Sequence, residues 1–202
     1  MSAKVMNVPS HRILQPSHVR DLRRENAVLK RRLARALEEC RRDGLTGVYN
    51  RRHFELLMNR IVHERIGSPR PMTVILVDID HFKSINDRFG HLIGDLALKH
   101  AAQLLVDTVE LDGVVCRYGG EEFAILVEDG NEAPASIAER IRAAIEKNPL
   151  TLSAGQIDMT VSIGVSSKLA QAGRPFQTQL LKDADDALYR AKANGRNRVE
   201  VS

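Results

Sequence analysis

From residue 43 onward, short apolar runs of strand length alternate with segments whose apolar residues recur at helical spacing. Apolar runs of about 4–8 residues are typical of buried strands, and a period of about 3.6 residues is typical of amphipathic helices. Their alternation predicts a mixed α/β domain. Strands are predicted at residues 72–78, 114–118, 122–127, 159–166 and 198–201, and helices at 92–109, 133–147 and 182–193.

A Gly119-Gly120 pair separates two of these apolar runs. Two glycines between strand-like segments are a strong hairpin signal. The sequence therefore predicts that residues 114–118 and 122–127 form an antiparallel pair joined by a two-residue turn.

The N-terminal part of the chain follows a different pattern. Residues 1–16 show no period and are predicted to be a flexible tail, whereas residues 17–42 carry apolar residues spaced alternately three and four apart. This heptad seam predicts a parallel dimeric coiled-coil helix, with Asn26 at an a position to set the register. A lone solvated helix with one apolar stripe remains the alternative. The seam consists of Val19, Leu22, Asn26, Leu29, Leu33, Ala36 and Cys40.

Charge and composition narrow the class of protein. The net charge of +4 hides a contrast, because residues 1–42 carry 11 Lys/Arg against 4 Asp/Glu and residues 43–202 carry 19 against 22. A mildly acidic body argues against nucleic-acid binding. No apolar stretch is long enough for a transmembrane helix, so no membrane contact is expected. Two cysteines make no disulfide framework, which predicts a cytoplasmic protein.

Acidic residues follow two of the predicted strands. Asp78 and Asp80 end one apolar run, and Glu121 and Glu122 follow the glycine pair. If the two strands lie side by side, these carboxylates converge, and two like charges about 4 Å apart repel by roughly 4 kcal/mol at an effective dielectric of about 20. Bound cations relieve that repulsion, and all-oxygen ligands suit Mg²⁺ or Mn²⁺. Two alternatives stay open: Asp80 caps the next helix, and the hairpin acids are simply solvated.

Residues 117–123, reading RYGGEEF, resemble the signature of the GGDEF family of diguanylate cyclases in its GGEEF form. The resemblance covers residues 43–202 and implies a nucleotide-cyclase-like palm. That α/β fold, of the α+β type, has a mostly antiparallel five-stranded sheet flanked by helices, here preceded by the N-terminal coiled-coil helix. The other matching segments are DGLTGVYNRR (43–52), DIDHFKSINDRFGHLIGD (78–95), TVSIGVS (160–166) and ADDALYRAKANGRN (184–197).

The resemblance implies a metal-dependent enzyme that condenses two GTP molecules into cyclic di-GMP and releases two pyrophosphates. The domain is expected to act as a homodimer, held through the coiled coil at Val19–Cys40. Asp78 and Glu122, with the carbonyl of Ile79, match the metal ligands of the family, with Mg²⁺ or Mn²⁺ as the cofactor. Glu121 matches a further ligand and the general base.

The same resemblance assigns residues to the GTP substrate. Asn86 and Asp95 match the guanine-binding positions, and a carboxylate at 95 accepts from both guanine donors, a pair that adenine lacks. The remaining matches are His91 in the same segment, Phe82 and Lys83 in the phosphate-binding turn, and Lys192 and Arg196 at the terminal phosphates. Alternatives stay open here too: Phe82 belongs to the core, His91 caps a helix and Lys83 is solvated. Asp43, Asn50 and Arg51 are expected to brace the junction between the coiled coil and the domain rather than to contact substrate.

The chain departs from the family at the Arg-x-x-Asp product-inhibition site, where Glu110 and Gly113 replace the two charged residues. Product inhibition is therefore expected to be absent. No sensory domain is recognisable, and a regulatory protein that binds the N-terminal helix is one source of input. Two other functions stay open: an inactive domain that binds GTP or cyclic di-GMP as a receptor, and a scaffold whose basic helix binds nucleic acid or an acidic partner.

Overall fold

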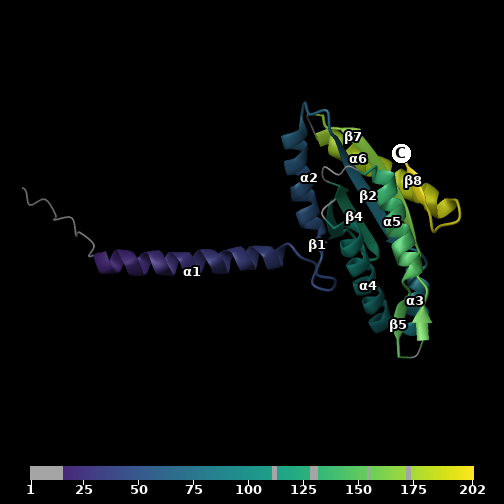
Figure 1. Ribbon diagram of the computed structural model, residues 1–202, viewed down its shortest axis with the longest axis horizontal. Coiled ribbons are helices and arrows are strands. Elements are labelled where there is room, and N and C mark those ends of the chain that lie inside the picture. The colour runs from purple at the N-terminus through teal and green to yellow at the C-terminus, as the bar shows by residue number, and fades with distance from the viewer. Residues whose placement is uncertain (1–15, 111–112, 128–131, 154, 172–173) are drawn as a thin grey trace, which may run out of the picture. The chain divides into compact units, whose positions relative to one another are not determined.

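The computed structural model describes residues 16–110, 113–127, 132–153, 155–171 and 174–202. The chain divides after Cys40 into two compact units. The first contains the predicted helix, α1 (Pro16–Cys40), which is continuous and ends two residues earlier than expected (Figure 1). The predicted tail lies outside the described residues, apart from Pro16. Within this unit the seam residues Leu22, Leu29 and Leu33 are 53%, 61% and 60% exposed.

The second unit is built on one mixed sheet, and β2 is its central strand. Antiparallel pairs join β3 to β4, β4 to β2 and β2 to β7, and parallel pairs add β1 at one edge and β8 at the other. In sheet order the strands are β1 (Tyr49–Asn50), β3 (Gly113–Arg117), β4 (Glu122–Val127), β2 (Pro71–Ile79), β7 (Val161–Leu169) and β8 (Val199–Val201).

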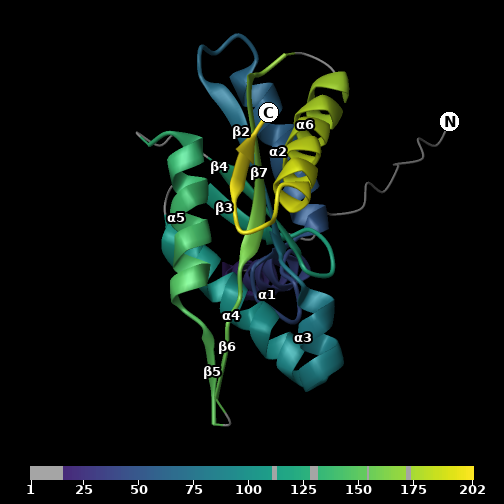
Figure 2. The same cartoon turned by 90° about the vertical axis from the view of Figure 1, so that its right-hand side faces the viewer.

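Helices cover both faces of this sheet. On one face α4 and α5 pack over alternate residues of β2, such as Ile75 and Val77, and on the other α2 and α6 pack over Val74 and Leu76 (Figure 2). Because both faces are covered, β2 is buried from Met72 to Ile79 and reads as a continuous apolar run. The helices are α2 (Arg51–Arg65), α3 (Phe82–Phe89), α4 (His91–Val109), α5 (Pro134–Lys147) and α6 (Arg174–Ala193).

The expected α/β palm with a mostly antiparallel sheet is confirmed, but three details differ. The sheet has six strands rather than five, because the two-residue strand β1 pairs with β3. Helix α6 begins eight residues before the predicted start. A separate ribbon of β5 (Leu150–Leu152) and β6 (Gly155–Ile157) was not predicted, since three-residue strands carry too little pattern.

Helix α2 was also missed, although its signal is present in the sequence. Its buried residues recur at helical spacing, and the side chain of Asn50 accepts a hydrogen bond from the backbone N–H of His53 at the N-terminus. Such a cap followed by periodic apolar residues is a helix start signal. The buried set is Phe54, Leu57, Met58, Ile61 and Val62.

Gly164 in β7 allows α6 to approach the sheet closely. A Cβ atom at this position would lie 2.1 Å from the carbonyl oxygen of Ala184 and 2.3 Å from the backbone nitrogen of Leu188. Both neighbours are helix backbone, so they cannot rotate away. The absence of a side chain at residue 164 therefore sets the distance between α6 and the central strands.

We expect Gly164→Ala to lower the free energy of unfolding by about 1–3 kcal/mol, because α6 must move away from β7. Chemical denaturation measures this loss. Gly44→Ala is the matched control, since nothing lies within 4 Å of a Cβ at residue 44. Its effect should stay within about 0.5 kcal/mol. Equal stabilities of the two variants would contradict the close packing.

Candidate active site

Strand pairing brings the two acidic motifs together. Asp78, the next-to-last residue of β2, lies directly opposite Glu122, the first residue of β4. The backbone N–H of Ile79 donates to the carbonyl of Glu121 at 3.4 Å, which extends the pairing by one step. Asp78 is 7% exposed, and Glu121 and Glu122 are half-buried. Three carboxylates therefore gather at one end of the sheet, as the two sequence motifs predicted.

Burial and like charge act on Asp78 in the same direction. Loss of contact with solvent raises the pKa of this carboxyl above 3.8, and Glu121 and Glu122 raise it further. Lys192 opposes them, since its Nζ lies 2.7 Å from Asp78 Oδ2. In this structure, the ammonium group of α6 thus neutralises the buried charge.

The donor chemistry of this cluster fits a hard divalent cation. Among the described residues no three Asp, Glu, His or Cys side chains are arranged around a common point as metal ligands. The three carboxylates and the carbonyl of Ile79 nevertheless offer only oxygen donors, which suit Mg²⁺ or Mn²⁺. The raised pKa of Asp78 marks a site where added positive charge would be favourable.

The hairpin turn before Glu122 is confirmed, but it is longer than predicted. Residues 118–121 separate β3 from β4, and the backbone N–H groups of Tyr118 and Gly119 both donate to the carbonyl of Glu122. A Cβ at Gly119 would lie 2.5 Å from Glu122 Oε2. The glycine therefore leaves room for the carboxylate of Glu122 over the turn.

Arg117 holds this turn to the start of the domain. Its guanidinium donates to the carbonyl of Gly120 at 2.7 and 3.1 Å and to the carboxylate of Asp43 at 3.1 and 3.3 Å. Asp43 in turn accepts from the backbone N–H and hydroxyl of Thr46 at 2.9 and 2.7 Å. Asp43 is thus connected to the glycine turn through Arg117, which lies 74 residues away in the chain.

The segment assigned to guanine lies on α3 and α4, which pack against each other at Gly94. A Cβ at Gly94 would fall 1.9 Å from Asn86 Oδ1, so glycine leaves room for the Asn86 side chain in its present conformation. Asp95, the next residue, is half-buried. His91 is exposed at the first position of α4, and Gly90 rather than His91 is the N-cap, so the capping alternative is wrong.

The turn assigned to phosphates precedes α3. His81 has a left-handed backbone with φ 55°, and the first helical hydrogen bond runs from Ser84 N–H to its carbonyl. The N–H groups of Phe82 and Lys83 come before that bond, as an anion site at a helix N-terminus requires. The ring of Phe82 is 9% exposed in the core, while Lys83 is exposed.

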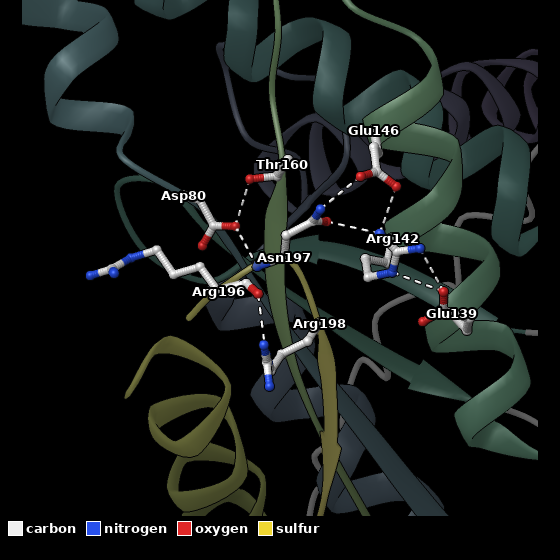
Figure 3. Close-up of polar contacts among 8 residues, drawn as sticks. All are labelled: Asp80, Glu139, Arg142, Glu146, Thr160, Arg196, Asn197 and Arg198. Atoms are coloured by element: carbon white, nitrogen blue, oxygen red, sulfur yellow. Dashed lines mark hydrogen bonds and ion pairs between the residues drawn. The ribbon is translucent and has the colours of Figure 1, made fainter. Parts of the chain in front are cut away.

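Asp80 does not cap α3, so that alternative is wrong. Its carboxylate accepts from the hydroxyls of Thr160 and Ser162 and from the backbone N–H of Asn197. Sequence patterns did not indicate these partners, which lie directly before β7, within β7 and in the turn after α6. The neighbouring Arg196 directs its side chain away from Asn197, as Figure 3 shows.

We expect Asp43→Asn to lower the free energy of unfolding near neutral pH by about 1–3 kcal/mol, because the ion pair with Arg117 is lost. Burial acts to raise the pKa of Asp43, but hydrogen bonds from Thr46 and Arg117 outweigh it and hold the pKa below 3.8. A carboxyl with a lowered folded-state pKa stabilises the protein above its unfolded value and loses that contribution as the pH falls through the folded value.

The stability difference between the unaltered chain and Asp43→Asn should therefore shrink below about pH 3.8. Urea denaturation at a series of pH values measures it. A difference that stays constant from neutral pH to below pH 3 would show that the charge of Asp43 contributes nothing.

Comparisons with known proteins agree with this arrangement. The family model described as "Diguanylate cyclase, GGDEF domain" matches residues 40–198. The response regulator PleD of Caulobacter vibrioides is 41% identical over 174 residues, which cover 85% of this chain and 38% of PleD. This chain therefore spans well under half of that relative.

Two crystal structures share the fold. The coiled coil and GGDEF domain of DgcB from Caulobacter crescentus, in complex with c-di-GMP, matches with a TM-score of 0.79 and 28% identity over 92% of this chain and 98% of that one. Diguanylate cyclase SiaD from Pseudomonas aeruginosa, in complex with its activator SiaC, matches with a TM-score of 0.77 and 27% identity over 92% of this chain and 71% of that one. The family match over residues 40–198 shows that this chain belongs to the GGDEF family of diguanylate cyclase domains.

Proposed function

We propose that this chain is an active diguanylate cyclase that condenses two GTP molecules into cyclic di-GMP and two pyrophosphates. The observation that carries the proposal is the meeting of Asp78, Glu121 and Glu122 at one end of the sheet in a GGDEF domain. In each of two equivalent steps, a ribose 3′-oxygen forms a bond to the α-phosphorus of the other GTP. The bond from that phosphorus to the pyrophosphate oxygen breaks.

Recognition of guanine is assigned to the contact between α3 and α4. Asn86 is held beside Gly94, and Asp95 follows directly. A carboxylate at 95 accepts hydrogen bonds from N1–H and the exocyclic amine of guanine. Adenine offers no such donor pair, so binding adenine would leave a half-buried charge without partners. We therefore propose GTP rather than ATP as the substrate, with His91 contacting it at the exposed start of α4.

The triphosphate is assigned to two elements on either side of Asp78. The N–H groups of Phe82 and Lys83 at the start of α3 provide backbone donors. Lys192 and Arg196, at the end of α6 and in the following turn, provide positive charge for the terminal phosphates. Since Lys192 is bonded to Asp78 in this structure, its contact with phosphate requires the side chain to leave that carboxylate.

Proton transfer is assigned to Glu121. Its carboxylate is half-buried next to Asp78 and Glu122, so it stands among the groups that would hold the cation. Mg²⁺ or Mn²⁺, held by Asp78, Glu122, Glu121 and the Ile79 carbonyl, would neutralise charge on the α-phosphate and the leaving pyrophosphate. Glu121 then accepts the proton of the attacking 3′-hydroxyl.

Inhibition by the product through the Arg-x-x-Asp site, at residues 110–113, should be absent. Glu110 has a left-handed backbone with φ 47°, and a Cβ at Gly113 would lie 2.5 Å from the carbonyl oxygen of Leu126. A cavity of about 440 Å³ beside these residues is lined by Arg42, Glu110 and Gly113, among others. Aspartate at 113 is excluded by backbone, and Glu110 repels a phosphate instead of pairing with it.

A homodimer through α1 completes the proposal, because each domain holds one GTP and the product needs two. The seam leucines are exposed within their own unit, which supports a coiled coil at Val19–Cys40 that brings two domains together. A regulatory protein that binds α1 is a second proposed partner, in keeping with the activator complex of SiaD. None of the described helices is long and apolar enough to cross a membrane. The buried thiol of Cys116, which forms no disulfide, supports a reducing, cytoplasmic setting.

We expect Asp78→Asn and Glu121→Gln each to reduce cyclic di-GMP formation by at least about a hundredfold, because the cation site or the base is lost. Product formation from GTP and Mg²⁺ measures this, and thermal unfolding tests the fold. Asn at 78 removes a buried charge, so the variant should unfold at the same or a higher temperature. Asp186→Asn, exposed on α6, is the control. Retained activity in either variant would remove that residue from the mechanism, and GTP binding without turnover in the unaltered chain would indicate a receptor.

We expect replacement of Leu22, Leu29 and Leu33 by Lys to give monomers that bind GTP but turn it over slowly at low protein concentration. Activity per chain should rise as the variant is concentrated. Sedimentation and rate measurements over a concentration series test this together. The control replaces Ala27, Val28 and Ala34 by Lys, which adds the same charge to α1 outside the seam. A monomeric seam variant with full activity per chain at nanomolar concentration would exclude α1 as the catalytic dimeriser.

A further inference from the structure

The carboxylate of Asp80 is buried and fully hydrogen-bonded. It is 5% exposed and accepts from Ser162 Oγ at 2.7 Å, Thr160 Oγ1 at 2.8 Å and the backbone N–H of Asn197 at 3.0 Å. Its own N–H donates to the carbonyl of Thr160 at 2.9 Å. A buried carboxylate persists only when its oxygens have such donors. Asp80 therefore ties the end of β2 to β7 and to the turn between α6 and β8.

That turn has an unusual backbone. Gly195, Arg196 and Asn197 have φ angles of 108°, 58° and 47°, so three successive residues are left-handed. Asparagine tolerates this region better than most residues, whereas a long side chain such as arginine does not favour it. Such a conformation persists only where surrounding contacts determine it. The bond from Asn197 N–H to Asp80 is one such contact, and the bond from Arg196 N–H to the Ala191 carbonyl is another.

The side chain of Asn197 provides two more. Its Oδ1 accepts from Arg142 at 2.9 Å, and its Nδ2 donates to Glu146 at 2.7 Å, both on α5 (Figure 3). Arg142 is itself held by Glu139 and Glu146 at 2.7–2.8 Å. The hydrogen bond from Arg142, and then that from Asn197, lowers the pKa of Glu146. Asn197 is thus bonded by its backbone to Asp80 and by its side chain to α5.

Arg196 directly precedes Asn197 in this turn. Its carbonyl accepts from Arg198 Nε at 3.2 Å, and its side chain extends away from Asn197 and Arg198 (Figure 3). The backbone conformation at 195–197 therefore sets the direction in which the Arg196 side chain leaves the main chain. Asp80 is two residues from Asp78. The hydrogen bond from Asn197 N–H to the Asp80 carboxylate therefore connects this turn to the end of β2, where the acidic cluster lies.

We propose that Asp80 and Asn197 are positioning residues that place Arg196 to bind the terminal phosphates of a nucleoside triphosphate. Asp80 is not a metal ligand in this assignment, because its oxygens are already occupied by three donors. The inference rests on the proposed function, since the phosphates in question are those of GTP. It adds to that function a connection from α5, through Asn197, to the phosphate-binding arginine.

Binding measurements separate positioning from folding. With Mg²⁺ present, Asn197→Ala should bind a non-hydrolysable GTP analogue about tenfold more weakly in calorimetry, while its affinity for GMP, which lacks the terminal phosphates, stays unchanged. Asn197→Gly keeps the left-handed backbone and the N–H donated to Asp80, so it should retain more affinity than Asn197→Ala. Thermal unfolding shows whether each variant is folded. If Asn197→Ala does not fold, the binding measurements are made with Asn197→Gly instead.

A double-mutant cycle with Arg196→Ala gives the decisive comparison. If Asn197 acts through Arg196, adding Asn197→Ala to Arg196→Ala should change affinity for the GTP analogue by less than about twofold. An undiminished tenfold loss in that background, or an equal loss for GMP, would overturn the inference. Failure of the unaltered chain to bind the analogue would overturn the proposed function as well. Binding by the unaltered chain with no loss in Asn197→Ala would overturn this inference alone.

The connection to α5 is tested with a matched pair of variants on that helix. Arg142→Gln removes the donor to Asn197 Oδ1 and should weaken binding of the GTP analogue by about threefold without changing GMP affinity. Arg140→Gln removes a comparable surface pair with Glu132 and should leave both affinities unchanged. Equal effects of the two variants would exclude a role for α5 in positioning Arg196.

Discussion

The antiparallel pairing of β2 with β4 places Asp78 opposite Glu122, and the candidate site depends on that register. A shift by one residue would turn Asp78 to the other face of the sheet and separate the carboxylates. The register is held by the fit of the β2 and β4 side chains against helices on both faces of the sheet. Glycines 119 and 164 permit the close approaches on either side, to the Glu122 carboxylate and to α6.

The two buried aspartates at the end of β2 are stabilised in different ways. Asp78 is buried next to two glutamates, and Lys192 is the cation that its carboxylate contacts. Asp80, two residues later, is instead satisfied by hydroxyl and backbone donors. The two aspartates of one short motif thus have different surroundings: Asp78 pairs with a lysine among other carboxylates, and Asp80 joins three segments of the chain. A similar division applies to Arg196 and Asn197, whose side chains diverge from consecutive left-handed positions.

Two sets of contacts connect distant parts of the domain to the acidic cluster. Arg117 joins the glycine turn to Asp43 at the start of the domain, and Asn197 joins Asp80 to α5. In each set, one side chain or residue forms hydrogen bonds with two different segments. A displacement of one segment therefore alters the hydrogen bonds to the other. Through these hydrogen bonds, the first turn of the domain and helix α5 are both connected to the groups that we assign to GTP binding.

Much of the fold was predictable from the sequence, because strand and helix periods and the glycine pair are local signals. The acidic cluster was predicted only on the condition that two strands pair, because β2 and β4 are neighbours in the sheet but α3, α4 and β3 separate them in the chain. The heptad seam likewise predicted α1 from its spacing alone. Tertiary structure alone decided the roles of Asp80 and Asn197, which are 117 residues apart in the chain. It also decided that Arg117 bonds to Asp43 and that Gly94 and Gly164 admit close neighbours. Hydrogen bonds and close contacts between segments far apart in the chain leave no periodic pattern in the sequence, so only the folded chain shows which side chains meet.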